Sequence, residues 1–146
     1  MIIPPFLIPI GVGIIAQLSK PIFNRKWWRD QINRSDPLPQ YGGMPSAHTA
    51  FATSLATIVG LTDGIYTASF AVAVGVLIFI LDDALRLRVF LGRFGVAIRR
   101  LLQLIPEEDR KSLPHIEGRI GHTAPEVLVG AIIGIIVTVL IWTVNQ

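Results

Sequence analysis

Residues 127–143, with the sequence VLVGAIIGIIVTVLIWT, contain no charged side chain. A helix that crosses the hydrocarbon core of a bilayer needs about 20 predominantly apolar residues. The segment approaches that length if the helix begins near Ala124 and holds Glu126 close to the membrane surface. This stretch therefore predicts a transmembrane helix over residues 124–143 and, with it, an integral membrane protein.

Three earlier segments are also apolar. Residues 2–19 and 64–81 are free of charge, whereas residues 47–62 are shorter and rich in Thr and Ser. The first segment has neither a basic start nor a small-residue cleavage site, so it is expected to be a retained anchor. We expect an all-α protein with a single membrane domain over residues 1–146 and about four transmembrane helices.

The composition of the whole chain agrees with this class. Of 146 residues, 51% are hydrophobic and 16% are charged, and the mean hydropathy is +0.58. Soluble domains carry about 25% charged residues. The absence of cysteine rules out a disulfide framework and a thiolate metal site. The net charge of +3 comes from residues between the apolar segments, which favours anionic lipids over nucleic acid as partners.

The basic residues also predict the topology. All 13 Lys and Arg residues lie in two segments, residues 20–46 and 82–123. The positive-inside rule makes both segments cytoplasmic loops and leaves both chain ends outside a cell inner membrane. The helices expected at residues 47–62 and 124–143 then begin at the same, cytoplasmic, face.

The second loop begins with arginines interleaved among apolar residues. Arg86, Arg93 and Arg100 are spaced by seven, so they form one stripe on a helix. The stretch over residues 82–104 therefore predicts an amphipathic helix that lies at the membrane interface.

Residues 42–48, GGMPSAH, stand at the start of the helix expected at 47–62. The first turn of a helix offers N–H groups and a positive dipole end, so it can bind an anion. Ser46 is a plausible N-cap, and Gly43 allows the backbone to approach a bound anion closely. A capped helix with His48 at the membrane interface is the alternative interpretation.

Residues 121–126, GHTAPE, stand at the start of the last apolar helix. His122 and Glu126 are four apart, so they share one helical face. A carboxylate that holds one imidazole nitrogen leaves the other to attack or to accept a proton. The residues Thr123 and Glu126 also match a capping box, and the two interpretations can coexist.

Other features allow more than one interpretation. Asp82 and Asp83 could bind Mg²⁺, or they could pair with nearby arginines. Arg88 could clamp a phosphate with two hydrogen bonds, or it could extend to the membrane surface. Gly130 and Gly134 form a small-residue packing motif, either within the chain or in a homo-oligomer.

Together, residues 42–48, 83–88 and 121–127 resemble the divergent branch of the type-2 phosphatidic acid phosphatase superfamily, which includes lipid phosphate phosphatases and vanadium haloperoxidases. The resemblance extends from Lys20 to about Gly134. It implies a metal-independent phosphatase without a cofactor, which acts through a phosphohistidine.

The resemblance also implies roles for individual residues. The family's nucleophilic histidine, with an acidic residue four positions later, corresponds to His122 and Glu126, with Glu in place of Asp. The general acid of its Pro-Ser-Gly-His motif corresponds to His48, with Ala47 in place of Gly. The family's phosphate-binding Arg and Lys correspond to Arg88 and Lys20. Ser46 and Gly43, at the start of the helix expected at 47–62, are further candidates for binding phosphate, and Asp83 is a candidate for a supporting role.

The expected substrate is a phosphomonoester, or a diphosphate, on a membrane lipid at the cytoplasmic surface. Phosphatidylglycerophosphate, phosphatidic acid and prenyl phosphates all fit. Two alternatives stand beside this function: a Mg²⁺-dependent lipid phosphotransferase that uses Asp82 and Asp83, and a catalytically inactive membrane scaffold or lipid-binding protein.

The topology can be tested with reporter fusions in a bacterial host. A reporter that is active only outside the membrane should be active after Gln146 and inactive within residues 82–123, because the basic residues hold that loop inside. A C-terminal reporter found in the cytoplasm would contradict the shared face of the two histidine motifs.

Overall fold

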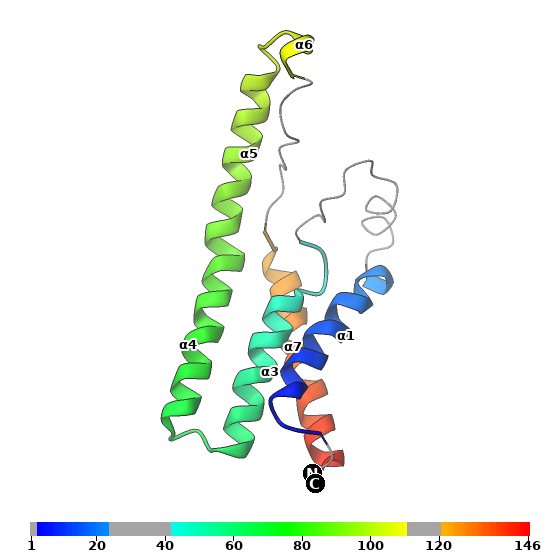
Figure 1. The fold of residues 1–146 in the computed structure, drawn as a ribbon, viewed down its shortest axis with the longest axis vertical. Coiled ribbons are helices and arrows are strands. Elements are labelled where there is room, and N and C mark those ends of the chain that lie inside the picture. The colour runs from blue at the N-terminus through cyan, green and yellow to red at the C-terminus, as the bar shows by residue number, and fades with distance from the viewer. Residues whose placement is uncertain (1–2, 24–41, 111–120) are drawn as a thin grey trace.

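The computed structural model describes residues 3–23, 42–110 and 121–146, and this part of the chain contains helices and no strand (Figure 1). The all-α prediction is confirmed for these residues. The helices are α1 (Leu7–Phe23), α3 (Ala47–Thr62), α4 (Ala68–Asp82), the π-helical turn η1 (Asp83–Leu87), α5 (Arg88–Leu102), the short α6 (Glu107–Arg110) and α7 (Ala124–Val144).

Helix α3 is the centre of the bundle and packs on α1, α4 and α7 (Figure 1). The two chain ends meet at one end of the bundle. There the side chain of Asn145 donates a hydrogen bond to Ile3 O (2.8 Å) and accepts one from Ile3 N (2.9 Å). At the opposite end α1 finishes while α3 and α7 begin. The histidine motifs therefore share one end of the bundle. That this end faces the cytoplasm stays a prediction.

The closest helix contact is between α3 and α7, and two glycines make it possible. A Cβ atom on Gly134 would lie 2.7 Å from Ala50 O, and one on Gly130 would overlap the Ser46 carbonyl. Both glycines are buried under α3. These two glycines are therefore used for packing within the chain, and the expected homo-oligomer stays a prediction.

The polar side chains of the bundle interior pair across the same contact. Ser54 Oγ lies 2.6 Å from Thr138 Oγ1, and the Thr138 hydroxyl also donates to Gly134 O at 2.6 Å. Ser54 and Thr138 are both 0% exposed. Paired hydroxyls avoid the cost of an unsatisfied polar group in an apolar interior, so they hold the two helices in one register.

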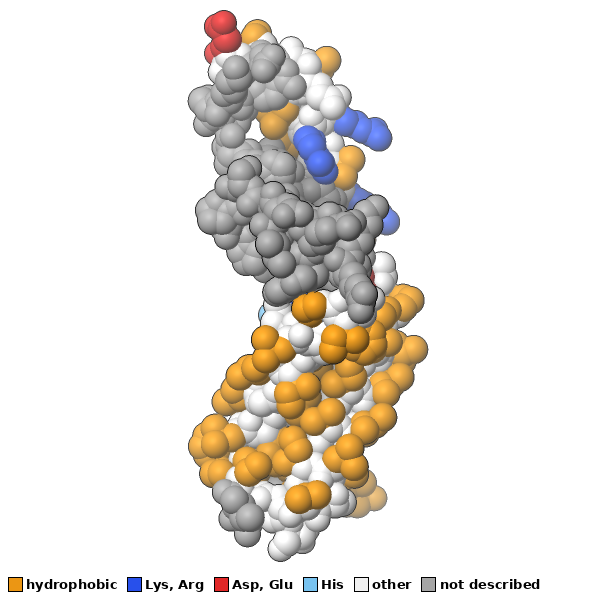
Figure 2. All heavy atoms as spheres, turned by 90° about the vertical axis from the view of Figure 1, so that its right-hand side faces the viewer, with side chains coloured by type: hydrophobic (Ala, Val, Ile, Leu, Met, Phe, Trp, Pro, Cys, Tyr) orange, Lys and Arg blue, Asp and Glu red, His pale blue; other side chains and the backbone are white. Residues whose placement is uncertain are grey.

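The apolar surface points to a membrane. On the face that Figure 2 shows, hydrophobic side chains cover most of the lower part of the molecule, and the Lys and Arg side chains lie in the upper part. Large hydrophobic residues face outward on α1, α4 and α7; examples are Leu18 (72% exposed), Val72 (67%) and Leu128 (61%). An apolar surface of this extent marks contact with lipid rather than water.

Two helices are long and apolar enough to cross a bilayer by themselves: the 35-residue helix Ala68–Leu102 and the 21-residue α7. Helices α1 and α3 have 17 and 16 residues. At 1.5 Å per residue they are about 25 Å long, a little short of the ~30 Å hydrocarbon core. These helices support the expected membrane protein class. The expected number of four transmembrane helices stays a prediction.

The first helix begins later than the sequence suggests. Pro4 and Pro5 lie before it and contribute only carbonyl groups, which accept the N–H groups of Leu7 and Ile8 at 3.0 and 3.2 Å. The helix therefore starts at Leu7 rather than near residue 2 and runs on to Phe23.

The amphipathic helix expected in the second loop is present as α5, but it continues α4 in line (Figure 1). The combined helix is about 52 Å long at 1.5 Å per residue, which exceeds the ~40–45 Å thickness of a whole bilayer. Residues of α5 thus extend past the apolar part of the bundle. Their position at a membrane interface stays a prediction.

The glycine contact between α3 and α7 can be tested by two matched substitutions. Gly134→Ala should lower the free energy of unfolding by about 1–3 kcal/mol, because its new Cβ meets backbone atoms. Gly75→Ala on α4 should leave stability unchanged or raise it, since a Cβ there meets nothing within 4 Å. Thermal unfolding in detergent measures both, and an equal Tm for the two variants would contradict the packing argument.

Candidate active site

The residues that the sequence proposed for catalysis meet where α1 ends and α3 and α7 begin. His48 interacts electrostatically with Arg88, His122, Lys20 and Asp83. Lys20 interacts in the same way with Glu126. These residues come from four separate parts of the chain, so the fold gathers them into one charged cluster.

His122 and Glu126 form a buried pair at the start of α7. The distance from His122 Nδ1 to Glu126 Oε2 is 3.2 Å, and the two residues are 7% and 6% exposed. The same oxygen accepts a hydrogen bond from the N–H of Thr123, the N-cap residue, at 3.0 Å. One carboxylate therefore caps the helix and holds the imidazole by Nδ1, which makes Nε2 the nitrogen that can react with a substrate.

Ser46 connects the start of α3 to the start of α7 by a hydrogen bond. Its N–H donates to Glu126 O (3.0 Å), and its Oγ accepts from Thr49 N and from Thr49 Oγ1 (2.9 Å). Ser46 is 0% exposed. The structure thus makes Ser46 the N-cap of α3, with its N–H and its Oγ engaged by protein groups, and its contact with phosphate stays a prediction.

Lys20 lies in the last turn of α1 and is 6% exposed. Its Nζ donates to Gly42 O at 3.1 Å. A lysine that served only as a topological anchor would extend to the membrane surface. Lys20 instead points into the charged cluster and fastens the segment before α3 to α1.

The two glycine-containing motifs touch each other at this end. Gly42 and Gly43 have φ angles of +109° and +85°, and Gly121 has a φ of +141°. A Cβ on Gly42 would lie 3.0 Å from Gly121 O. The segments before His48 and before His122 therefore lie in direct contact. This close approach is possible because glycine has no side chain. The predicted contact of Gly43 with phosphate stays a prediction.

His48 is in the first turn of α3 and is exposed, in contrast to the buried His122. An exposed imidazole within electrostatic range of Arg88 and His122 can reach a group that enters from outside. The arrangement offers one buried imidazole fixed by a carboxylate and one accessible imidazole beside it.

The two neighbouring aspartates pair with different arginines. Asp82 Oδ1 lies 2.9 Å from Arg86 Nε on the exposed side of the helix, and Asp83 Oδ2 pairs with Arg88 Nε on the half-buried side. The two carboxylates therefore do not form a common oxygen site. Within the described ranges no group of three or more His, Cys, Asp or Glu residues is arranged to hold a metal ion.

Sequence reasoning did not find the part played by Ala84. Its carbonyl oxygen accepts the N–H of His122 at 3.3 Å, so the helix that carries Arg88 also holds the backbone of His122. No local sequence pattern marks this contact, because it depends on the tertiary packing of the two segments.

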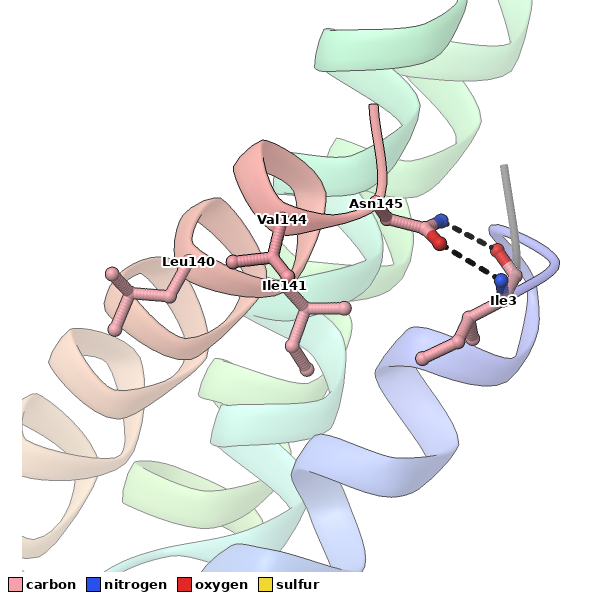
Figure 3. A pocket seen from close by; sticks show the side chains of 5 residues that line it. All are labelled: Ile3, Leu140, Ile141, Val144 and Asn145. Carbon is pink, nitrogen blue, oxygen red and sulfur yellow. Dashed lines mark hydrogen bonds between the residues drawn. The ribbon is translucent and has the colours of Figure 1, made fainter.

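An apolar groove of about 370 Å³ lies at the other end of the bundle (Figure 3). Its lining residues are Ile3, Leu140, Ile141, Val144 and Asn145. The Asn145 amide in this groove is bonded to the backbone of Ile3, and His122 lies at the opposite end of α7. The groove is therefore separate from the charged cluster.

Comparison with known proteins agrees with the motifs. The profile of the divergent PAP2 family matches residues 3–137. The chain is also 29% identical over 114 residues to the uncharacterized membrane protein YuiD of Bacillus subtilis, an alignment that covers 68% of this chain and 70% of YuiD. No solved structure matches. The motifs around His48 and His122, the apolar helices and the profile match agree, and the chain belongs to the divergent PAP2 family.

Proposed function

We propose that this protein is a phosphatase that removes a phosphate group from a membrane lipid through a phosphohistidine intermediate. The observation that carries the proposal is the buried His122–Glu126 pair beside the exposed His48. Membership of the divergent PAP2 family and the membrane character of its relative support the general class.

The first step is an in-line displacement at phosphorus. The lone pair of His122 Nε2 forms a bond to phosphorus while the bond from phosphorus to the lipid oxygen breaks. His48 gives its proton to that departing oxygen, so an alcohol leaves. The Glu126 carboxylate stabilises the positive charge that develops on the His122 ring, and Nδ1 keeps its proton.

The second step releases inorganic phosphate. Water attacks phosphorus, His48 takes the proton of that water, and the bond from phosphorus to Nε2 breaks with its electrons returning to His122. Arg88 and Lys20 lie in the same cluster as both histidines. Their positive charges offset the charge on the non-bridging oxygens in both steps.

The place of the cluster indicates the kind of substrate. It lies at the end of the apolar bundle where α1 ends and α3 and α7 begin (Figure 1). A lipid whose tails lie beside the bundle would present its phosphate at this level. Phosphatidylglycerophosphate, phosphatidic acid and prenyl phosphates all have this form. The positive-inside rule predicts that the reaction takes place at the cytoplasmic surface of the cell inner membrane.

Purified protein should release phosphate from a panel of these lipids, and histidine variants should fail. His122→Ala should abolish turnover, because no other group in the mechanism forms the bond to phosphorus. His48→Ala should lower kcat by roughly 10²–10⁴-fold, the usual contribution of a general acid. The wild-type rate should persist in EDTA, which separates this mechanism from a Mg²⁺-dependent transfer.

A matched pair of arginine variants controls this experiment. Arg88→Gln should lower kcat/KM by roughly 10-fold or more because it removes a charged contact to phosphate. Arg86→Gln should have no effect, since Arg86 pairs with Asp82 on the exposed side. Full activity in both histidine variants would refute the mechanism. If the wild type releases phosphate from none of the lipids, the alternative of a catalytically inactive membrane scaffold would be favoured.

A further inference from the structure

The helix that carries Arg88 contains one π-helical turn, η1, at the level of the charged cluster. In an α-helix the N–H of Arg88 would bond to Ala84 O, four residues earlier. In this structure it bonds to Asp83 O, five residues earlier. The shift releases Ala84 O from Arg88, and that oxygen accepts the N–H of His122 at 3.3 Å. Single π-helical turns of this kind occur frequently at functional sites.

The same turn changes which side chains share a face. Residues five apart in an α-helix are separated by about 140° around the axis, at 100° per residue. Across η1, however, Asp83 Oδ2 meets Arg88 Nε, and both side chains are about three-quarters buried. The preceding pair, Asp82 and Arg86, keeps α-helical spacing and stays exposed. Two successive Asp–Arg pairs thus face different directions, and the π-spaced pair is the one that acts electrostatically on His48.

The segment before His122 lies directly on the residues that follow this turn. A Cβ atom on Gly121 would be 3.1 Å from Val89 N and 3.2 Å from the carbonyl carbon of Arg88. Ala84 is 3% exposed beneath the contact. The backbone that holds His122 and the backbone that holds Arg88 are therefore in van der Waals contact.

We propose that η1 sets the relative position of Arg88 and His122, and that Asp83 is a positioning residue that orients the Arg88 guanidinium toward the substrate phosphate. The inference rests on the proposed function, in which Arg88 contacts phosphate. A guanidinium has five N–H donors, and the pair with Asp83 engages the Nε edge. Asp83 and Arg88 both act electrostatically on His48, so the oriented group lies beside the general acid.

The test compares Asp83→Asn with the matched control Asp82→Asn, one position away. Two quantities are measured on the purified full-length protein: kcat and KM for phosphate release, and the affinity for inorganic vanadate by calorimetry. Asp83→Asn should lower kcat/KM and vanadate affinity by roughly 10-fold, at an unchanged Tm. Asp83→Glu should recover part of both, and Asp82→Asn should match the wild type.

A double-mutant cycle separates positioning from a general structural role. If Asp83 acts through Arg88, Asp83→Asn should have no further effect on vanadate affinity in an Arg88→Gln background. An equal loss with and without Arg88 would overturn the inference. So would an Asp83→Asn variant that behaves like Asp82→Asn.

The outcomes also separate this inference from the proposed function. If the wild type releases phosphate but Asp83→Asn is unimpaired, the function stands and the positioning role is wrong. If no lipid is hydrolysed but vanadate binds in a manner that depends on Asp83, the function is wrong and the role in anion binding stands. A wild type that neither hydrolyses lipids nor binds vanadate would refute both.

Discussion

Glu126 is the residue on which the arrangement of this end of the molecule depends. Its carboxylate caps α7 through Thr123 N–H and holds His122 Nδ1. Its backbone carbonyl accepts the N–H of Ser46, the N-cap of α3, and its charge acts on the buried Lys20. A single residue therefore joins the starts of two helices, the end of a third and the candidate nucleophile.

This connection answers an electrostatic problem that the fold creates. Helices α3 and α7 begin side by side, so their positive dipole ends lie at the same place and repel each other. The glycines of α7 bring the two backbones still closer, because Gly130 and Gly134 have no Cβ to separate them. A buried carboxylate at this point lowers the repulsion, and an anionic substrate would lower it further.

Local spacing and charge distribution were enough to predict much of this site. The spacing of four between His122 and Glu126 gave their contact, and the placement of basic residues gave a common end for His48 and His122. Gly130 and Gly134 predicted close helix packing, yet a small-residue motif does not say which helix will cover it. Here α3 covers it.

Other features were out of reach because they depend on tertiary contacts. Ser46 was a predicted phosphate contact, but its N–H is used by a carbonyl that is distant in sequence. No sequence rule predicts the π-helical turn at Asp83–Leu87, since Asp, Ala, Leu and Arg all occur in ordinary α-helices. Its hydrogen bond to His122 joins the two ends of the predicted second loop, residues 82–123.

The charges of the cluster explain how phosphate binding and proton donation can be linked. Arg88 is balanced by Asp83, and the charge of Lys20 is offset by Glu126. These four side chains sum to no net charge, so the positive ends of α3 and α7 add to the attraction of Arg88 and Lys20 for a phosphate. A bound dianion in turn favours the protonated form of a nearby imidazole. The bound substrate would thereby help to keep His48 protonated, and His48 needs that proton for the departing oxygen of the lipid.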